Sequence, residues 1–327
     1  MSIIEKAASR IDRQRNNAAA TAVIPSEPAD IAIPADVTIL EAREPVQPSA
    51  DLVVASAADP VVDPVVIQPA PAPGSDAAQV SAARANPRRV ELDLAKMRDM
   101  GLVTAAGGRT SLLEEFRIIK RPLLKRAFAE RAPGDMPPNL IMVTSSLPGE
   151  GKTYCAINLA MSIAMELDHT VLLVDADVAR PSVLRTLGLP AERGLMDMLV
   201  DDSLDMSNVL LRTNVDTLTI LPAGTSTPRA TELLASSTMT SLVTEIANRY
   251  PDRVVIFDSP PLLLTSESRV LASHMGQIVM VVEAQTTTQH AVAEALHRLE
   301  GIKNVNLIYN KARDIPGIEE TYDYHYG

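Results

Sequence analysis

Lys152 and Thr153 stand in a setting that suits phosphate chemistry. They follow a short loop that contains Gly149 and Gly151. Glycines let a backbone approach phosphate oxygens closely and aim N–H groups at them. In such a loop the lysine bridges the β- and γ-phosphates, and the threonine hydroxyl binds Mg²⁺. The spacing therefore predicts a phosphate-binding loop, although the usual pattern has a glycine where this chain has Ser146.

The elements that must position this loop are a strand and a helix. Leu140 to Val143 is a short apolar run that predicts a buried strand, and an apolar-periodic helix runs from Tyr154 to about Glu166. The N-terminus of that helix would add its partial positive charge to the phosphate site. A Gly-Lys-Thr triplet alone could be a chance turn, but the order of strand, glycine loop and helix favours phosphate binding.

Three aspartates stand where predicted strands end. Asp175 and Asp177 follow one apolar run, and Asp258 follows another. Carboxylates placed beside a phosphate loop can hold Mg²⁺ directly or through water, and a second one can orient and deprotonate a hydroxyl nucleophile. The alternative is a set of loop acids that cap the following helices. That alternative would suffice for one aspartate, whereas three at strand ends favour the metal and base roles.

The order of predicted elements indicates an α/β fold. Near-continuous apolar strands separated by helices imply a mostly parallel sheet with helices on both faces. In such sheets the ligand site lies in the loops after the carboxyl ends of the strands. Further strands are predicted at 170–175, 217–221, 253–258, 277–282 and 305–310, and helices at 183–187, 195–199, 230–235, 239–249 and 291–299. A longer helix should begin near Ser111, where Ser111 and Glu114 have capping-box spacing, and Pro122 should kink or divide it.

The chain divides into three parts. Residues 1–88 are rich in proline and alanine and contain no aromatic residue, so we predict a disordered region with at most a short amphipathic helix over Ile3–Asp12. Residues 89–310 form the predicted globular domain. Residues 311–327 show no apolar period and predict a flexible tail, in which Tyr322, Tyr324 and Tyr326 alternate. Alternation also suits a strand edge, but the flanking acids favour tyrosines presented as substrates.

Composition excludes several classes of function. The net charge of −11 over 327 residues argues against general nucleic-acid binding. A single cysteine, Cys155, excludes a disulfide framework and fits a reducing compartment. The sequence has no signal-peptide core and no run of about 20 apolar residues. These features predict a cytoplasmic protein.

Several motifs in the same order resemble those of the bacterial tyrosine autokinases linked to exopolysaccharide synthesis, particularly the exosortase-associated type. These motifs are Thr144–Thr153 as Walker A, Leu172–Asp177 with Arg180 and Pro181 as the second Walker motif, and Val255–Pro261 as Walker B. The segments Leu221–Gly224, Glu232–Leu234 and Glu114–Leu124 are also similar to that family, whose fold is that of the P-loop NTPases. The likeness covers about residues 90–327.

The resemblance implies an ATP- and Mg²⁺-dependent tyrosine kinase. Lys152, Asp175 and Asp177 would be catalytic, with base and metal roles not divided among the acids. Thr153, Asp175, Asp177 and Asp258 would bind the metal. The nucleotide would contact Pro148, Gly149, Glu150, Gly151, Lys152, Thr153 and Tyr154. Asn310, which ends the last strand, would hydrogen-bond adenine or simply cap a turn.

The resemblance also implies partners and a location. Glu114, Arg117 and Lys120 fall on a self-association motif of the family and suggest a ring-like homo-oligomer, although the family has arginine at the third position and lysine cannot reproduce its bidentate contact. The three tail tyrosines would be the phosphoacceptors. The activator would be a membrane-bound polysaccharide co-polymerase that recruits the kinase to the inner face of the membrane.

Two other functions share these motifs. One is a partition- or septum-positioning ATPase, a nucleotide-switched binding protein. Proteins of that kind carry an additional lysine near the start of the phosphate loop, where this chain has Leu147, and the tyrosine tail also favours the kinase. The other is an adaptor that uses ATP only for assembly, which the intact Lys152 and the three acids make the weaker hypothesis.

Overall fold

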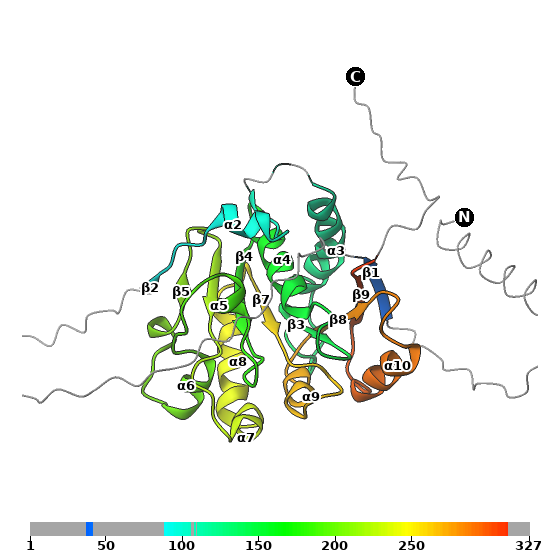
Figure 1. Cartoon of the computed structure of the whole chain (residues 1–327). Helices are drawn as coiled ribbons and strands as arrows, with labels where there is room; N and C mark the ends of the chain where they lie inside the picture. Colours follow the sequence, from blue (N-terminus) through cyan, green and yellow to red (C-terminus); the bar gives the residue numbers. More distant parts are fainter. Residues whose placement is uncertain (1–36, 42–87, 106–107, 109, 313–327) are drawn as a thin grey trace, which may run out of the picture. The chain divides into compact units, whose positions relative to one another are not determined.

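The computed structural model describes residues 37–41, 88–105, 108 and 110–312, which are coloured in Figure 1. The predicted helix over Ile3–Asp12, most of the predicted disordered region and the tail tyrosines therefore lie outside the described residues. None of the described helices is both long and apolar enough to cross a bilayer.

Nine strands of the described residues form one sheet in the order β1-β9-β8-β3-β7-β4-β6-β5-β2 (Figure 1). Every neighbouring pair is parallel except β5 and β6. The predicted parallel sheet is confirmed. The strands are β1 (Val37–Glu41), β2 (Arg88–Arg89), β3 (Leu140–Ser145), β4 (Thr170–Asp175), β5 (Leu211–Arg212), β6 (Leu218–Leu221), β7 (Arg253–Asp258), β8 (Gln277–Glu283) and β9 (Val305–Asn310).

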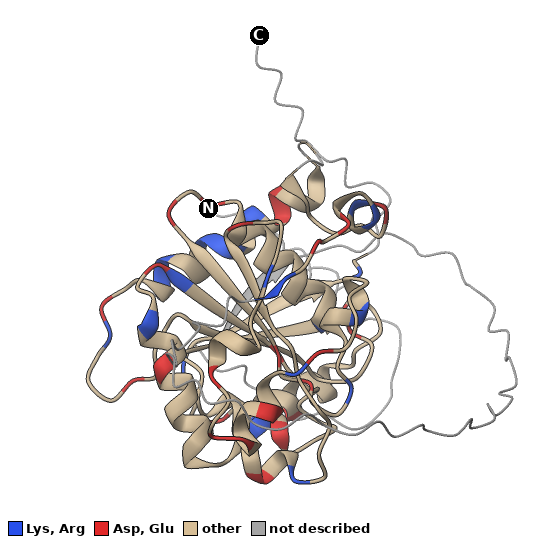
Figure 2. Ribbon diagram, turned by 90° about the vertical axis from the view of Figure 1, so that its left-hand side faces the viewer, with Lys and Arg blue, Asp and Glu red and all other residues tan. Residues whose placement is uncertain are grey.

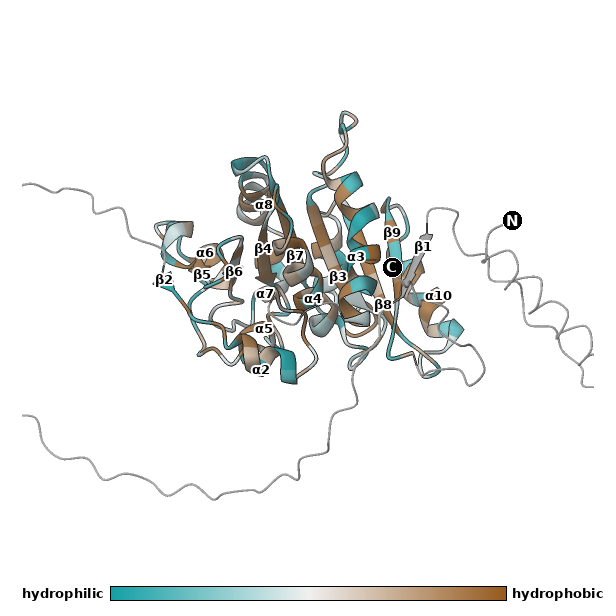
Figure 3. Cartoon of the chain, turned by 90° about the horizontal axis from the view of Figure 1, so that it is seen from above, coloured by the Kyte–Doolittle hydropathy of each residue, from teal (hydrophilic) through white to brown (hydrophobic). Residues whose placement is uncertain are grey.

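Helices cover both faces of this sheet. One face packs against α2 (Leu94–Asp99), α3 (Ser111–Ala127), α4 (Lys152–Ala164) and α5 (Val183–Thr186). The other packs against α6 (Leu195–Val200), α7 (Ala230–Leu234), α8 (Ser237–Arg249), α9 (Glu267–Ala272) and α10 (Gln289–Arg298), and a short 3₁₀ turn, η2 (Met206–Asn208), precedes β5. Figure 2 shows the charged residues mainly on helices and loops, and Figure 3 shows the hydrophobic residues concentrated on the strands.

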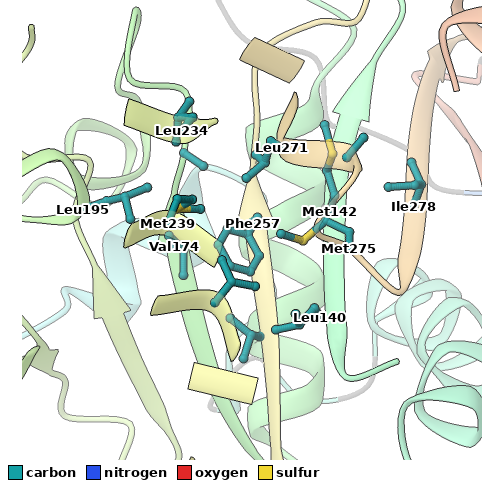
Figure 4. Packing of buried hydrophobic residues seen from close by; sticks show 14 of the residues in the cluster. Leu140, Met142, Val174, Leu195, Leu234, Met239, Phe257, Leu271, Met275 and Ile278 are labelled. Atoms are coloured by element: carbon teal, nitrogen blue, oxygen red, sulfur yellow. The ribbon is translucent and has the colours of Figure 1, made fainter. Parts of the chain in front are cut away.

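Alternation along each strand divides the core into two clusters. In β3, Ile141 and Val143 belong to the cluster under α3 and α4, while Leu140 and Met142 belong to the opposite cluster. Successive side chains of a strand point to opposite faces, so a strand buried on both faces must be apolar throughout. Figure 4 shows the second cluster, where Phe257 of β7 packs among methionine and leucine side chains. The site-bearing strands are therefore fixed on both sides.

The start of α3 differs from the prediction. Thr110, not Ser111, caps the helix, and its hydroxyl accepts a hydrogen bond from the Leu113 amide. The predicted kink at Pro122 does not divide the helix, which runs unbroken from Ser111 to Ala127. Pro122 and Ile118 are both exposed, so water can reach the Ile118 carbonyl that the proline ring leaves without a donor.

Some short elements were not predicted. The strand β1 lies inside the region that we predicted to be disordered, and it pairs in parallel with β9. Its residues Val37-Thr-Ile-Leu have high β-propensity, which the average composition of residues 1–88 does not reveal. The two-residue strands β2 and β5 and the helix α9 were also missed. The boundary of the globular domain and the disorder of the remaining N-terminal residues stay predictions.

Candidate active site

The loop between β3 and α4 has the backbone that its glycines predict. Gly149 has φ of 90° and Gly151, the N-cap of α4, has φ of 94°. Both values lie in the left-handed region, where a side chain would be strained. Ser146 keeps an ordinary negative φ, since the described non-glycine residues with positive φ are Gln285, Asn304 and Lys311. This explains why serine suffices where the usual pattern has glycine.

Lys152 points from the first turn of α4 into a group of carboxylates. Its Nζ lies 2.7 Å from Asp177 Oδ2 and 3.8 Å from Asp258 Oδ1, and its side chain is only 12% exposed. Burial by itself would lower the pKa of this ammonium, but the Asp258 and Asp177 carboxylates outweigh burial and raise the pKa above its ordinary value. The lysine is therefore charged and able to neutralise phosphate oxygens.

Asp175 and Asp258 face each other across the ends of β4 and β7, where they are paired in register. The Thr153 hydroxyl donates to Asp258 Oδ2 at 2.7 Å and lies 2.8 Å from the Ser182 hydroxyl. Burial, followed by repulsion from Asp258, raises the pKa of Asp175 to about 7. Burial also raises the pKa of Asp258 to about 6, although Lys152 opposes it. Burial and mutual repulsion thus make the ionised forms of these acids unfavourable, and a bound cation would stabilise them.

Asp175 also caps a helix, which is the alternative to a metal role. Its Oδ2 accepts hydrogen bonds from the Ser182 amide at 3.0 Å and the Val183 amide at 2.9 Å, at the start of α5. Its other oxygen, Oδ1, is buried without a hydrogen-bond partner, and so is Asp258 Oδ1. Oδ2 of Asp175 therefore has a structural role as a helix cap, while Oδ1 has no hydrogen bond in this structure.

The donor set fits Mg²⁺ in the manner of a nucleotide site. Among the described residues no three His, Cys, Asp or Glu side chains form a cage for a metal. Magnesium, however, usually binds through one or two carboxylates together with substrate phosphates and water. The Thr153 hydroxyl and Asp258 Oδ1, which has no hydrogen bond, supply such a partial set, with Asp175 Oδ1 at the end of the neighbouring strand.

A pocket of about 210 Å³ opens beside the lysine. Its lining combines phosphate-loop residues, cations and an apolar side, namely Pro148, Gly149, Lys152, Asp177, Ala179, Arg180, Ser182, Arg185, Pro260, Pro261, Leu264 and Thr265. Asp177 belongs to this lining, whereas Asp175 and Asp258 do not. The acids thus divide into one at the pocket surface and two beneath it.

Three residues predicted to contact the nucleotide have other contacts here. Glu150 is buried, and its carboxylate accepts from the Leu147 amide at 2.6 Å and from the Thr287 hydroxyl. The Tyr154 hydroxyl donates to the Gly101 carbonyl at 2.7 Å, and Asn310 Nδ2 donates to the Glu150 carbonyl at 2.9 Å. None of the three lines the pocket, and their contact with nucleotide stays a prediction.

The predicted self-association residues do not share one surface. Glu114 and Arg117 form an ion pair of 2.5 Å on the outer side of α3. Lys120 is 4% exposed, pairs with Glu166 at 2.5 Å and donates to the Ser162 carbonyl, so it links α3 to α4. In this structure its ammonium is not available to a second molecule.

Sequence reasoning missed the residues that hold the phosphate loop from the side of β8 and β9. Lys311 Nζ donates to the Gly149 carbonyl at 2.8 Å and lies 3.4 Å from Glu283 Oε2. Thr287 reaches Glu150 from the loop after β8. No motif marks these positions. Their only sequence signal is that they follow strands whose carboxyl ends meet at the ligand edge of the sheet.

A parallel sheet, a glycine loop, a lysine at a helix start and acids at strand ends together define a P-loop nucleotide-binding protein. Residues 139–313 match a family described as an AAA domain. The tyrosine-protein kinase YwqD of Bacillus subtilis is 32% identical over 191 residues, which cover 58% of this chain and 76% of YwqD. The tyrosine-protein kinase Wzc of Salmonella typhimurium is 28% identical over 193 residues, which cover 58% of this chain and 26% of Wzc.

Comparison with solved structures supports the same assignment. The kinase domain of the Escherichia coli tyrosine kinase ETK is 26% identical, with a TM-score of 0.55 over 66% of this chain and 82% of that domain. The chain belongs to the AAA-domain family and, within it, to the bacterial tyrosine kinases. The predicted resemblance is confirmed, and the kinase is favoured over the partition-type ATPase.

Proposed function

We propose that this kinase uses ATP and Mg²⁺ to phosphorylate its own C-terminal tyrosines, and that it regulates the synthesis or export of an exopolysaccharide. The observation that carries the proposal is the meeting of the Lys152 ammonium, the Thr153 hydroxyl and the Asp177 and Asp258 carboxylates beside one pocket. Each group suits one part of phosphoryl transfer, in which catalysis is mostly positioning and charge stabilisation.

The roles follow from where each side chain lies. Lys152 would bind the β- and γ-phosphate oxygens and neutralise charge that develops during transfer. Thr153 and Asp258 would hold Mg²⁺, with Asp175 beneath them. The metal, when bound, offsets the charge of the phosphates and orients them. Asp177 lines the pocket, so we assign to it the orientation of the acceptor hydroxyl.

The reaction balances with these groups. The phenol oxygen of the acceptor tyrosine forms a bond to the γ-phosphorus, and the bond from that phosphorus to the bridging oxygen of ADP breaks. The phenol proton passes to the Asp177 carboxylate as the bond forms. The exposed Leu264 and the neighbouring Pro261 line the same pocket and offer an apolar surface to a tyrosine ring.

The acceptors that we propose are Tyr322, Tyr324 and Tyr326, which lie close to Glu319, Glu320 and Asp323. Each phosphate would add about −1.5 to −2 charges to a chain whose net charge is already −11. Phosphorylated tails would then be repelled from a carboxylate-lined site, whereas unmodified tails could enter it. The tail would first be substrate and afterwards weaken self-association.

We further propose, from the family resemblance, a membrane-bound polysaccharide co-polymerase as activator. Its cytoplasmic portion would recruit the kinase to the inner face of the membrane. The homo-oligomer that the family resemblance suggests rests on Glu114 and Arg117 alone in this chain, because Lys120 is engaged inside the domain.

The test is phosphotyrosine formation by the purified full chain with ATP and Mg²⁺, with and without the cytoplasmic portion of a candidate activator. Mass spectrometry should find phosphate on the three tail tyrosines, and their joint replacement by phenylalanine should remove it while leaving ATP binding unchanged. Tyr250 and Tyr309 are matched controls because they are 40% and 38% exposed within the folded domain. Phosphate mainly on those two residues would contradict the assignment of the tail.

A further inference from the structure

Two consecutive carbonyl groups of the phosphate loop are held by the last residue of β9 and by the residue that follows it. Lys311 Nζ donates to the Gly149 carbonyl at 2.8 Å, and Asn310 Nδ2 donates to the Glu150 carbonyl at 2.9 Å. Asn310 is fully buried, so its bond is shielded from water. Both donors come from one short segment that is far from the loop in sequence and adjacent to it in the fold.

Fixing these carbonyls also fixes the amide groups that share their peptide planes. In a planar trans peptide the C=O bond and the following N–H bond point in opposite directions. When the carbonyls of Gly149 and Glu150 are turned toward β9, the amide N–H groups of Glu150 and Gly151 must turn away from it. Gly149 and Lys152, which flank these two amides in the chain, line the pocket.

Lys311 is itself held in place. Its φ of 57° is in the left-handed region, which a lysine rarely adopts. Its ammonium lies 3.4 Å from Glu283 Oε2 at the end of β8. Glu283 is in turn paired in register with Asn310, the last residue of β9. Uncommon backbone conformations at functional sites persist when their surroundings over-determine them. Here the surroundings are two strand ends and the phosphate loop.

A second contact holds the same loop from the same side. The buried Glu150 carboxylate accepts from the Thr287 hydroxyl, which follows β8, and from the Leu147 amide at the start of the loop. The loop is thus fixed by its carbonyls and by one side chain, all on the face turned away from Asp177 and Asp258.

We propose that Lys311, assisted by Asn310, is a positioning residue for phosphoryl transfer. It orients the Glu150 and Gly151 amides before nucleotide arrives, so that they meet the phosphates without reorganising the loop. The inference rests on the proposed nucleotide site but not on the identity of the acceptor tyrosine. Lys311 touches the loop backbone from outside the pocket, so it acts through the loop and not on the nucleotide.

The experiment compares Lys311→Met with Lys311→Arg and Lys303→Met in the full chain. Lys303 is a matched control, because it also pairs with an acid, Asp135 at 3.1 Å, but away from the phosphate loop. Affinities for Mg²⁺-ATP and for AMP are measured by calorimetry, kcat and KM by phosphotyrosine formation, and folding by thermal melting.

Lys311→Met should weaken ATP binding roughly 3- to 10-fold, the effect of about one hydrogen bond. AMP affinity should change little, because AMP lacks the phosphates that the Glu150 and Gly151 amides would bind. Lys311→Arg, which keeps a charged donor, should recover most of the loss, and Lys303→Met should match the wild type. Glu283→Gln should give a smaller loss of the same kind, which covers the case in which Lys311→Met folds poorly.

Unchanged ATP affinity and kcat in folded Lys311→Met would overturn the positioning role and leave the kinase assignment intact. Equal losses for ATP and AMP, or an equal loss in Lys303→Met, would also overturn it, because the effect would then be general. A wild-type protein that binds no ATP would instead overturn the proposed function.

Discussion

The phosphate loop is held on its two sides by groups of different chemistry. On the side of β4 and β7, Asp175, Asp177 and Asp258 lie around the single charge of Lys152, and two buried carboxylate oxygens have no hydrogen bond. On the side of β8 and β9, the Glu150 carboxylate and the Gly149 and Glu150 carbonyls accept from Thr287, Lys311 and Asn310 respectively.

We call the side of β4 and β7 the reacting side of the loop, and the side of β8 and β9 its supporting side. Buried polar groups without hydrogen bonds cost free energy, and at Asp175 and Asp258 a bound cation would offset that cost. The raised pKa values of Asp175 and Asp258 are a sign of that cost. The contacts from Thr287, Asn310 and Lys311 can keep the loop rigid before cation and phosphate bind on the reacting side. Changes on the two sides should therefore have different consequences.

The largest effect should come from Lys152→Ala on the reacting side. The change removes the one cation among the acids, and we expect phosphotransfer to fall by about 10²–10³-fold or more. Phosphotyrosine formation with ATP and Mg²⁺ measures the loss, and circular dichroism checks that the domain remains folded. Undiminished phosphotyrosine in a folded variant would contradict the assignment of the active site.

Asp175→Asn should change how stability depends on pH. The pKa of Asp175 is about 7 in the folded protein and 3.8 as its ordinary value. The folded state therefore binds a proton more readily, and its stability falls as pH rises from about 4 to about 7, by up to about 1.4 kcal/mol per pH unit. Without nucleotide or Mg²⁺, the variant should gain stability relative to wild type as pH rises. Thermal melting from pH 5 to 7.5 measures this trend.

Asparagine keeps an oxygen that can cap α5, so the Asp175→Asn comparison isolates the charge. His274 acts in the opposite direction, because burial lowers its pKa and makes low pH unfavourable, but it is present in both proteins. If the melting temperatures of wild type and variant change in parallel with pH across this range, Asp175 carries no buried charge.

The smallest effect should come from Thr287→Val on the supporting side. The valine cannot donate to the buried Glu150 carboxylate, and we expect a loss of about 1–2 kcal/mol in the free energy of unfolding. Nucleotide affinity should fall only a few-fold, because the carbonyl contacts remain. Thr286→Val is the control, since the Thr286 hydroxyl donates to Glu283 at an exposed position. Denaturant unfolding should separate the two variants, and equal stability would contradict the supporting role.

The reacting side could be predicted from sequence because its chemistry is local. Lys152 and Thr153 sit in a pattern of adjacent glycines, and Asp175 and Asp258 each end an apolar run, so strand periodicity alone brings them to one edge of the sheet. The six predicted strands of the domain are present with shifts of at most a few residues at their ends. Asp175 shows a limit, since capping and metal binding were weighed as alternatives for the aspartates, whereas one oxygen of Asp175 caps α5 and the other is free of hydrogen bonds.

The supporting side could not be predicted because its contacts join distant segments. Lys311 and Gly149 meet only because β9, β8 and β3 are neighbours in the sheet, which the sequence does not state. Lys120 shows a similar limit. Its motif spacing suggested a part in self-association, whereas the helix presents that position to the end of α4, where Glu166 and the Ser162 carbonyl pair with its ammonium. A solvated lysine and a buried, paired one look alike in sequence.

The place of β3 in the sheet governs the order in which the chain can fold during synthesis. This strand carries the phosphate loop, is apolar and buried, and pairs with β7 and β8, both of which leave the ribosome much later. Pairing across such separations is slow, because loop closure must precede any stabilising contact. Until β7 and β8 emerge, the nascent chain carries an apolar strand with two open edges, which makes it prone to aggregation. Lys152 can meet Asp258 only after β7 has emerged, so the reacting side of the phosphate loop cannot form before that strand.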